Sequence, residues 1–136
     1  MELYAENILE HYRHPRHRGL LADADVRHEE INHSCGDKVT LSLRLHDGCI
    51  TGVGWEGEGC AVSQAGMSLL SEELMGKRVP AAASMTQKDM LDLLGVPVGP
   101  RRFKCALLGM HTLKNALRAA DGLPPQSWVE TVSTED

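Results

Sequence analysis

Three cysteines and one aspartate are the residues of this chain best suited to metal or sulfur chemistry. Cys35 and Asp37 lie two residues apart on a turn with glycine between them, and Cys60 and Cys105 each lie where a helix is predicted to begin. A helix N-terminus lowers the pKa of a thiol, and Lys104 adds a positive charge beside Cys105. Three thiolates and one carboxylate form a tetrahedral set suited to zinc, or a binding edge for an iron–sulfur cluster.

The spacing of these residues predicts an open site. A structural zinc site usually takes its ligands in pairs from CxxC knuckles, and this chain contains no CxxC. Three separate elements must therefore fold together before a metal can bind, and such a site can stay open on one side. The alternative for any single cysteine is a small buried apolar residue.

Three further residues are weighed against this set. Cys49 flanks a turn on another element, so we interpret it as a non-ligand. His33 lies two residues before Cys35 and is a candidate substitute ligand, with an ordinary surface histidine as the simpler interpretation. His111 lies late in the last predicted helix, and we expect it to have no part in the site.

Composition and charge exclude several classes of protein. The chain of 136 residues has 19 acidic and 14 basic residues and a net charge of −5. This disfavours nucleic acid as a main partner, because phosphate binding requires a basic surface. No apolar run approaches the ~20 residues of a membrane span, and a signal-peptide pattern is absent. We therefore expect a cytoplasmic protein with no membrane partner, whose four cysteines serve metal binding or catalysis rather than disulfides.

A small antiparallel sheet is predicted ahead of Cys60. Residues 26–32 are predicted as an edge strand, and residues 38–46 alternate apolar and polar side chains with a period of two. Asp47-Gly48 is typical of a type I′ hairpin turn, which leads into a return strand over residues 49–57. These strands bring the Cys35 turn to one end of the sheet.

A bulge is predicted in the return strand. Strict two-residue pairing across the hairpin would leave Val53 and Trp55 on the wet face of the sheet. We therefore expect a bulge at Gly52 or Gly54 that turns both side chains inward.

The remaining elements are predicted as helices. Their ranges are residues 3–13, 60–75, a short helix that follows the capping box Thr86–Asp89 and stops at Gly95, and residues 101–120. Residues 79–84 are expected to be a loop. The first helix is predicted to bury Leu3, Ile8, Leu9 and Tyr12 on one stripe.

Two features at the ends of the chain carry hypotheses of their own. Residues 11–18 hold three arginines and three histidines, which predict either a solvated helix end or a docking patch for an acidic protein. We expect one domain over residues 1–122, followed by an acidic, flexible tail over residues 123–136. Trp128, within this tail, is the candidate to fold back onto the domain.

Four motifs in order resemble the U-type iron–sulfur assembly family, which comprises SufU, IscU and the N-terminal part of NifU. They are Cys35-Gly36-Asp37, GEGCAVSQA at residues 57–65, KCALL at 104–108 and HYRHPR at 11–16. The resemblance covers about residues 1–120. It implies an α+β fold, with a three-stranded antiparallel sheet packed against helices on one side. It also implies that Cys35, Asp37, Cys60 and Cys105 are the ligands.

The resemblance divides between two subtypes of that family. The short segment between the second and third cysteines is similar to IscU-type members. Lys104 before the third cysteine, and Val98-Gly99-Pro100-Arg101-Arg102 in place of the Leu-Pro-Pro-Val-Lys chaperone motif, are closer to SufU-type members.

Two functions follow from this resemblance, and the metal-binding residue types leave a third open. As a scaffold, the protein would accept persulfide sulfur from a cysteine desulfurase, assemble a [2Fe–2S] cluster on the four residues and pass it to apo iron–sulfur proteins or carriers. As a zinc-dependent sulfurtransferase, it would hold Zn²⁺ there and release one cysteine as the nucleophile. Cys35 is the expected acceptor in the SufU-like case and Cys105 in the IscU-like case, with Arg101 or Arg102 as candidates to steer the anionic sulfur. The third function is a structural zinc module that binds another protein.

Overall fold

The computed structural model describes residues 2–132, with side chains for residues 5–132. It is built around β2 (Asp37–His46), the strand with the strict apolar alternation. β2 lies between β1 (Val26–Asn32) and β3 (Cys49–Glu58) in an antiparallel sheet of order β1-β2-β3. The predicted α+β fold with a three-stranded antiparallel sheet is confirmed, and both predicted hairpin strands pair as expected.

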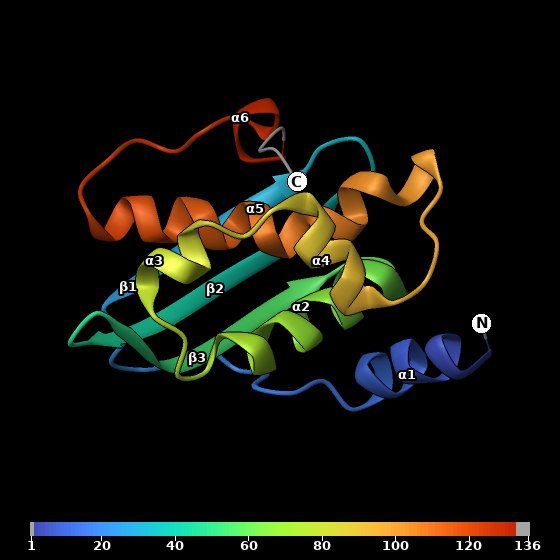
Figure 1. The fold of residues 1–136 in the computed structure, drawn as a ribbon, viewed down its shortest axis with the longest axis horizontal. Helices are drawn as coiled ribbons and strands as arrows, with labels where there is room; N and C mark the ends of the chain where they lie inside the picture. Colours follow the sequence, from blue (N-terminus) through green and yellow to red (C-terminus); the bar gives the residue numbers. More distant parts are fainter. Residues whose placement is uncertain (1, 133–136) are drawn as a thin grey trace.

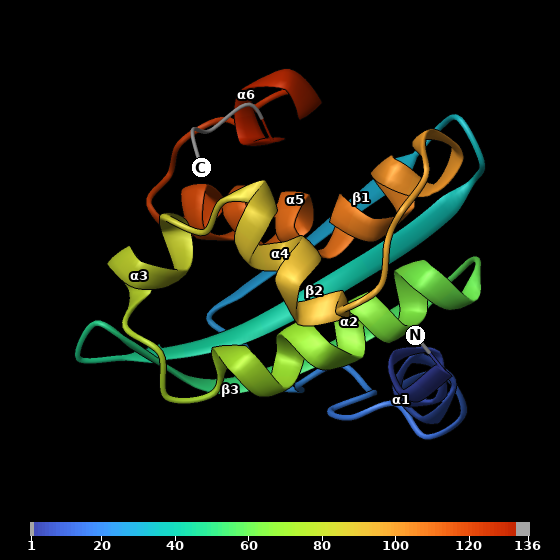
Figure 2. The ribbon, with the colours of Figure 1, turned by 45° about the vertical axis from the view of Figure 1, so that its right-hand side comes forward.

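Helices pack in layers on one face of this sheet (Figure 1). α2 (Ala61–Leu74) and α5 (Phe103–Ala120) lie directly on it, and α4 (Gln87–Leu94) packs across both of them. α1 (Glu2–Arg13) packs against α2 and crosses it, since Figure 2 looks down the axis of α1 while α2 runs across the view. The core between sheet and helices contains fully buried side chains, among them Leu41, Leu43, Ile50, Trp55, Met67, Leu70, Leu107 and Met110. None of the described helices is long and apolar enough to cross a membrane.

The predicted bulge exists, but its position was wrong. Leu45 pairs with Ile50 and Arg44 pairs with Gly52, so Thr51 is the additional residue. The shift turns Val53 and Trp55 into the core, as predicted. Gly54 is glycine for another reason, because a Cβ there would lie 2.3 Å from the Gly19 carbonyl oxygen. The segment before β1 thus passes close to β3 and covers its outer edge.

Two helical predictions are corrected. Residues 79–84 were expected to be a loop, but Val79–Ala83 forms the short helix α3, with Pro80 in its first turn and alanines that favour a helix. On α1, Ile8 is buried while Leu9 and Tyr12 are exposed. The buried face of α1 turns instead toward α2, where the His11 ring hydrogen-bonds to Ser68 at 2.7 Å. Leu3 lies outside the described side chains.

The other predicted boundaries agree closely with the structure. The capping box of α4 is present, and Gly95 ends that helix at a φ of +72°. The last predicted helix is divided into a 3₁₀ turn, η1 (Pro100–Arg102), and α5. Beyond α5, the helix α6 (Trp128–Val132) returns to the domain, where Trp128 stacks on His111 with ring centroids 4.1 Å apart. The flexibility of residues 123–136 stays a prediction.

Candidate metal centre

The turn between β1 and β2 presents Cys35 at one end of the sheet. The backbone amides of Cys35 and Gly36 both donate to the Asn32 carbonyl oxygen, at 3.2 and 2.7 Å. Gly36 closes the turn at a φ of +84°, which glycine adopts without strain. Cys35 is exposed, whereas Asp37 at the start of β2 is 4% exposed. The turn therefore places an accessible thiol beside a buried carboxylate.

Cys60 meets Asp37 from the next element. It is the N-cap residue of α2, one position before the helix begins, and its Sγ donates to Asp37 Oδ2 at 3.6 Å. Gly59 makes this approach possible: its φ is +148°, and a Cβ there would lie 2.5 Å from Asp37 Oδ1. A side chain at position 59 would therefore occupy space that the carboxylate needs.

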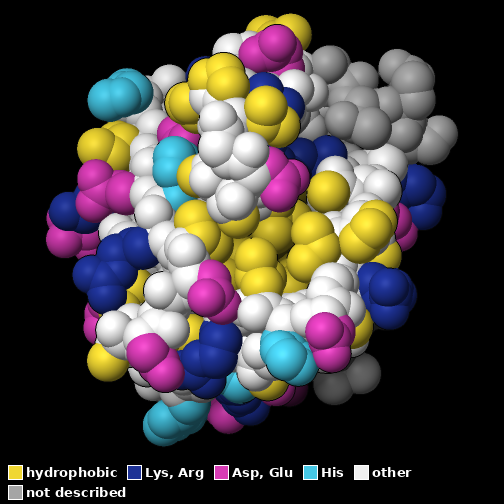
Figure 3. All heavy atoms as spheres, turned by 90° about the vertical axis from the view of Figure 1, so that its left-hand side faces the viewer, with side chains coloured by type: hydrophobic (Ala, Val, Ile, Leu, Met, Phe, Trp, Pro, Cys, Tyr) yellow, Lys and Arg dark blue, Asp and Glu magenta, His cyan; other side chains and the backbone are white. Residues whose placement is uncertain are grey.

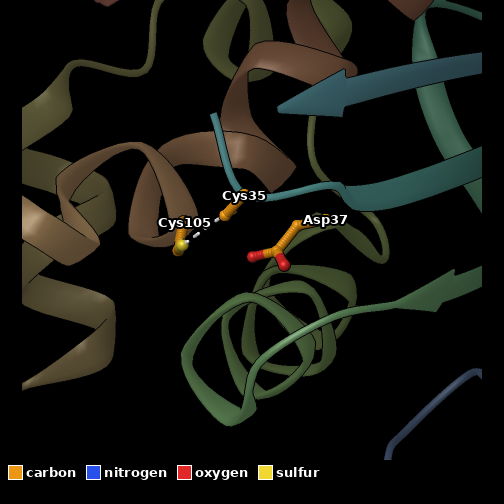
Figure 4. Close-up of side chains that lie close together, drawn as sticks. All are labelled: Cys35, Asp37 and Cys105. Atoms are coloured by element: carbon orange, nitrogen blue, oxygen red, sulfur yellow. Dashed lines mark hydrogen bonds between the residues drawn. The ribbon is translucent and has the colours of Figure 1, made fainter. Parts of the chain in front are cut away.

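Cys105 closes the group from the first turn of α5. Its Sγ lies 3.5 Å from the Sγ of Cys35, although 70 positions separate them in the sequence. One ligand atom each from Cys35, Asp37 and Cys105 lies within 4.8 Å of the others. Figure 4 shows these three side chains converging from the β1–β2 turn, the start of β2 and the start of α5. Cys60 joins them through its contact with Asp37.

The electrostatics of the group correct one prediction. The helix start and Lys104 were expected to lower the pKa of the Cys105 thiol, but burial raises it, and contacts with Asp37, Cys35 and Cys60 raise it further. The three thiols and the Asp37 carboxyl group therefore lie too close together for all of them to ionise unless a cation lies among them. A divalent metal supplies that charge and deprotonates coordinating thiols. Three sulfurs and one carboxylate therefore fit zinc, or the iron of an iron–sulfur cluster.

Asn32 is a site residue that the sequence analysis missed. It is 2% exposed, and its Nδ2 lies 3.1 Å from Cys35 Sγ and 4.0 Å from Cys105 Sγ. Its Oδ1 also accepts from the Ser34 amide at 3.2 Å. An amide donor to two sulfurs favours their thiolate forms. In the sequence, the only indication of this role is that Asn32 lies at the end of a predicted strand, three residues before Cys35.

A pocket of about 480 Å³ opens beside Cys35. Arg101 and Lys104 line it together with Cys35 itself, and both cations are exposed. The pocket gives access to the group from solvent on the side of the β1–β2 turn. Arg102, the other predicted steering residue, does not line it.

The structure separates the remaining candidates from the group. Cys49 begins β3 beside the hairpin turn at the opposite end of the sheet, where Arg78 Nη1 lies 3.9 Å from its Sγ. His33 is exposed and is not a member of the three-residue group. His111 is buried and pairs with Glu30 and Thr131 instead.

The basic run at residues 11–18 is largely neutralised by the chain's own acids. Arg16 lies 3.4 Å from Glu10 and 3.9 Å from Glu72, and Arg18 lies 3.0 Å from Glu56. These ion pairs join α1 and the segment after it to the rest of the domain. Docking of an acidic protein at this run stays a prediction.

Comparisons with known proteins place this arrangement in context. The chain is 35% identical to the iron–sulfur cluster assembly scaffold protein IscU of Thermotoga maritima, over 85% of this chain and 93% of that protein. It is 31% identical to the zinc-dependent sulfurtransferase SufU of Bacillus subtilis, over 88% and 92%. A crystal structure of a putative SUF-system scaffold protein from Fervidobacterium islandicum superimposes with a TM-score of 0.75 at 30% identity, over 85% and 97% of the two chains.

The family itself is shown by a match to most of the domain. Residues 3–122 match the model described as the NifU-like N terminal domain. This range contains all three strands, α2 to α5 and all but the first residue of α1, and it includes Cys35, Asp37, Cys60 and Cys105. The chain therefore belongs to the family of NifU-like N-terminal domains.

Proposed function

We propose that this protein accepts persulfide sulfur from a cysteine desulfurase and serves as a scaffold on which an iron–sulfur cluster is assembled. The observation that carries the proposal is an exposed thiol, Cys35, beside buried Asp37 and Cys105 in an open group of metal-binding type. Relatives named as scaffold and as sulfurtransferase support it.

Cys35 is the proposed acceptor of the sulfur. It is the accessible cysteine of the group, it lines the pocket, and Arg101 and Lys104 stand beside it to attract an anionic persulfide. Its thiolate attacks the outer sulfur of the desulfurase persulfide. A new S–S bond forms at Cys35, the old one breaks, and the desulfurase cysteine leaves as a thiolate, so no oxidant is needed. Cys105, at 5% exposed, is the alternative acceptor only after the start of α5 moves.

The proposed ligands of the metal or cluster are Cys35, Asp37, Cys60 and Cys105. A bound metal would supply the positive charge that keeps the thiols deprotonated. Asp37 contributes the weaker oxygen ligand among sulfurs, and this favours exchange over permanent binding. The cluster is cargo, and its recipients would be apo iron–sulfur proteins or carriers.

A zinc-dependent sulfurtransferase is the second candidate. It is favoured by the same exposure of Cys35, because a ligand at the edge of the group can leave a metal to act as a nucleophile while Cys60, Cys105 and Asp37 keep it. In this candidate the protein stimulates the desulfurase and need not carry a cluster.

Sulfur transfer and cluster assembly are tested together. The protein is purified with and without oxygen, its zinc and iron are measured, and it is mixed with a cysteine desulfurase and cysteine. A persulfide on Cys35, located by mass spectrometry, supports the proposed transfer. A reconstituted cluster that passes to an apo-ferredoxin supports the scaffold, whereas stoichiometric zinc with a stimulated desulfurase supports the transferase.

Two matched variants complete the test. Cys35→Ser is expected to abolish sulfur transfer, whereas Cys49→Ser, a half-buried cysteine at the far end of the sheet, is expected to leave it unchanged. Unchanged sulfur transfer in Cys35→Ser contradicts the assignment of the acceptor. Unchanged metal content in Cys60→Ser contradicts the shared four-residue site.

A further inference from the structure

A second pocket lies at the opposite end of α5 from the metal centre. Its volume is about 520 Å³, and its lining comes from α3, the C-terminal half of α5, the segment between α5 and α6, and α6 itself. Figure 3 faces this end of the molecule and shows apolar side chains gathered at its centre, with charged side chains around them. Val79, Ala83, Leu117 and Leu123 supply apolar lining, and Leu123 is 46% exposed. The established family motifs lie elsewhere.

The unusual member of this lining is Lys114. It is 8% exposed, and it makes no hydrogen bond or ion pair with any residue between 2 and 132. Burial lowers the pKa of Lys114, and the one carboxylate that opposes this, Asp89, is not within ion-pair distance. The stem of the side chain is buried, whereas its ammonium is not one of the fully enclosed atoms without a partner, and Lys114 lines the pocket. An anion in the pocket would give Lys114 the partner that the described chain does not.

The other charges of the pocket limit what that anion can be. Arg118 is already engaged, since its Nε donates to the Pro124 carbonyl oxygen at 2.7 Å. Asp121 and Glu130 also line the pocket, and Glu130 accepts from the Ser127 amide at 2.8 Å. Two carboxylates at the pocket repel a multiply charged anion such as phosphate or sulfate. A ligand with one negative charge and an apolar hydrocarbon part matches the ammonium of Lys114 and the aliphatic side chains that line the pocket.

We propose that this pocket binds a small aliphatic monocarboxylate. Its carboxylate would pair with Lys114 Nζ, and its hydrocarbon chain would contact Val79, Leu117 and Leu123. A charge-assisted hydrogen bond supplies the selectivity for the acid, and the burial of the chain supplies affinity. The proposal does not depend on the function of the metal centre.

Titration of the full chain with hexanoate, followed by amide chemical shifts and calorimetry, tests the proposal. Hexanoate is expected to shift amides of α3 and the second half of α5, whereas 1-hexanol and sulfate bind at least about tenfold more weakly. No binding of hexanoate at millimolar concentration overturns the proposal. Equal binding of 1-hexanol also overturns it, because the pocket is then only apolar.

Two variants locate the site. Lys114→Met keeps the length of the side chain and removes the charge, and it is expected to weaken hexanoate binding about tenfold. Lys88→Met, an exposed lysine on α4, is the matched control and is expected to change nothing. Ala83→Phe, at an exposed position of the lining, is expected to fill the pocket and block binding without loss of the fold. Unchanged binding in both Lys114→Met and Ala83→Phe overturns the assignment.

Discussion

The Sγ atoms of Cys35 and Cys105 lie 3.5 Å apart, one on an exposed turn and the other in the buried first turn of α5. A disulfide needs about 2.05 Å, so a small movement of the turn would join them. A metal held by both sulfurs would prevent this bond. The proposed metal ligation and the formation of a disulfide therefore exclude one another at these two thiols.

The first prediction concerns oxidation of the protein without metal. After chelation, a mild thiol oxidant is expected to form the Cys35–Cys105 disulfide, because these sulfurs are in contact and Cys35 is exposed. Peptide mapping of the disulfide checks this, and added zinc is expected to protect both thiols. Cys49→Ser should oxidise as the native chain does, and Cys105→Ser should not. A principal disulfide between Cys35 and Cys60 contradicts the geometry.

The sheet was predictable because its information is local. Alternation over residues 38–46 fixes the buried face, and Asp47-Gly48 fixes the turn. The position of the bulge was not predictable from the sequence. The additional residue is Thr51, whereas Gly54 is needed for a close approach to the carbonyl oxygen of Gly19, in a distant segment. A local sequence pattern does not reveal a close contact between residues as far apart in the chain as Gly19 and Gly54.

The proximity of the candidate site residues was predictable, and their electrostatics were not. The motifs nominated all four residues, but the pKa of Cys105 follows from burial that only the fold creates. His11 was interpreted as part of a basic run. In the structure it is buried against Ser68 of α2, because α1 packs on α2 and turns this side of the helix inward.

The second prediction tests the close approach at Gly59. Gly59→Ala is expected to weaken zinc binding by about tenfold or more, equivalent to about 1.4 kcal/mol, because the added Cβ would displace the Asp37 carboxylate. Its backbone conformation adds a loss of stability of about 1–3 kcal/mol. Zinc competition with a chromophoric chelator and urea unfolding measure the two effects separately.

Gly76→Ala is the matched control for that variant. Gly76 also has a positive φ, of +81°, but a Cβ there meets nothing within 4 Å. It is expected to lose about 1–2 kcal/mol of stability from backbone strain, with unchanged zinc affinity. Equal loss of zinc affinity in both variants would show that strain, and not contact with Asp37, is responsible.

The third prediction tests Asp37 as the ligand that permits exchange. Asp37→Cys offers four thiolates in place of three and a carboxylate, and it is expected to slow zinc release to a chelator by about tenfold or more. The fold should be kept, because Asp37 contacts the other members of the site and cysteine is no larger. Asp47→Cys, at the exposed hairpin turn, is the control. A loss of fold in Asp37→Ala, without any change in zinc exchange, favours the structural zinc module instead.

The fourth prediction concerns the stability of the domain below neutral pH. Burial lowers the pKa of His111, and Glu30 only partly opposes it. The pKa of His11 is lowered too, by burial and by Arg16. Below about pH 6.5 the unfolded chain therefore binds protons that the folded chain resists, and the free energy of unfolding falls as pH falls. Each histidine contributes at most about 1.4 kcal/mol per pH unit.

Urea unfolding of the chelated protein at pH 5.5 and 7.5 measures this dependence. His111→Gln is expected to reduce the difference in stability between the two pH values, because one buried imidazole no longer resists protonation. Part of the difference should remain, since His11 titrates in the same direction. His46→Gln, whose histidine side chain is 76% exposed, should leave the difference unchanged. A protein that becomes more stable as pH falls from 7.5 to 5.5 would show that Glu30, and not burial, governs the charge of His111, because the pair at 3.3 Å would then hold the imidazolium in the folded state.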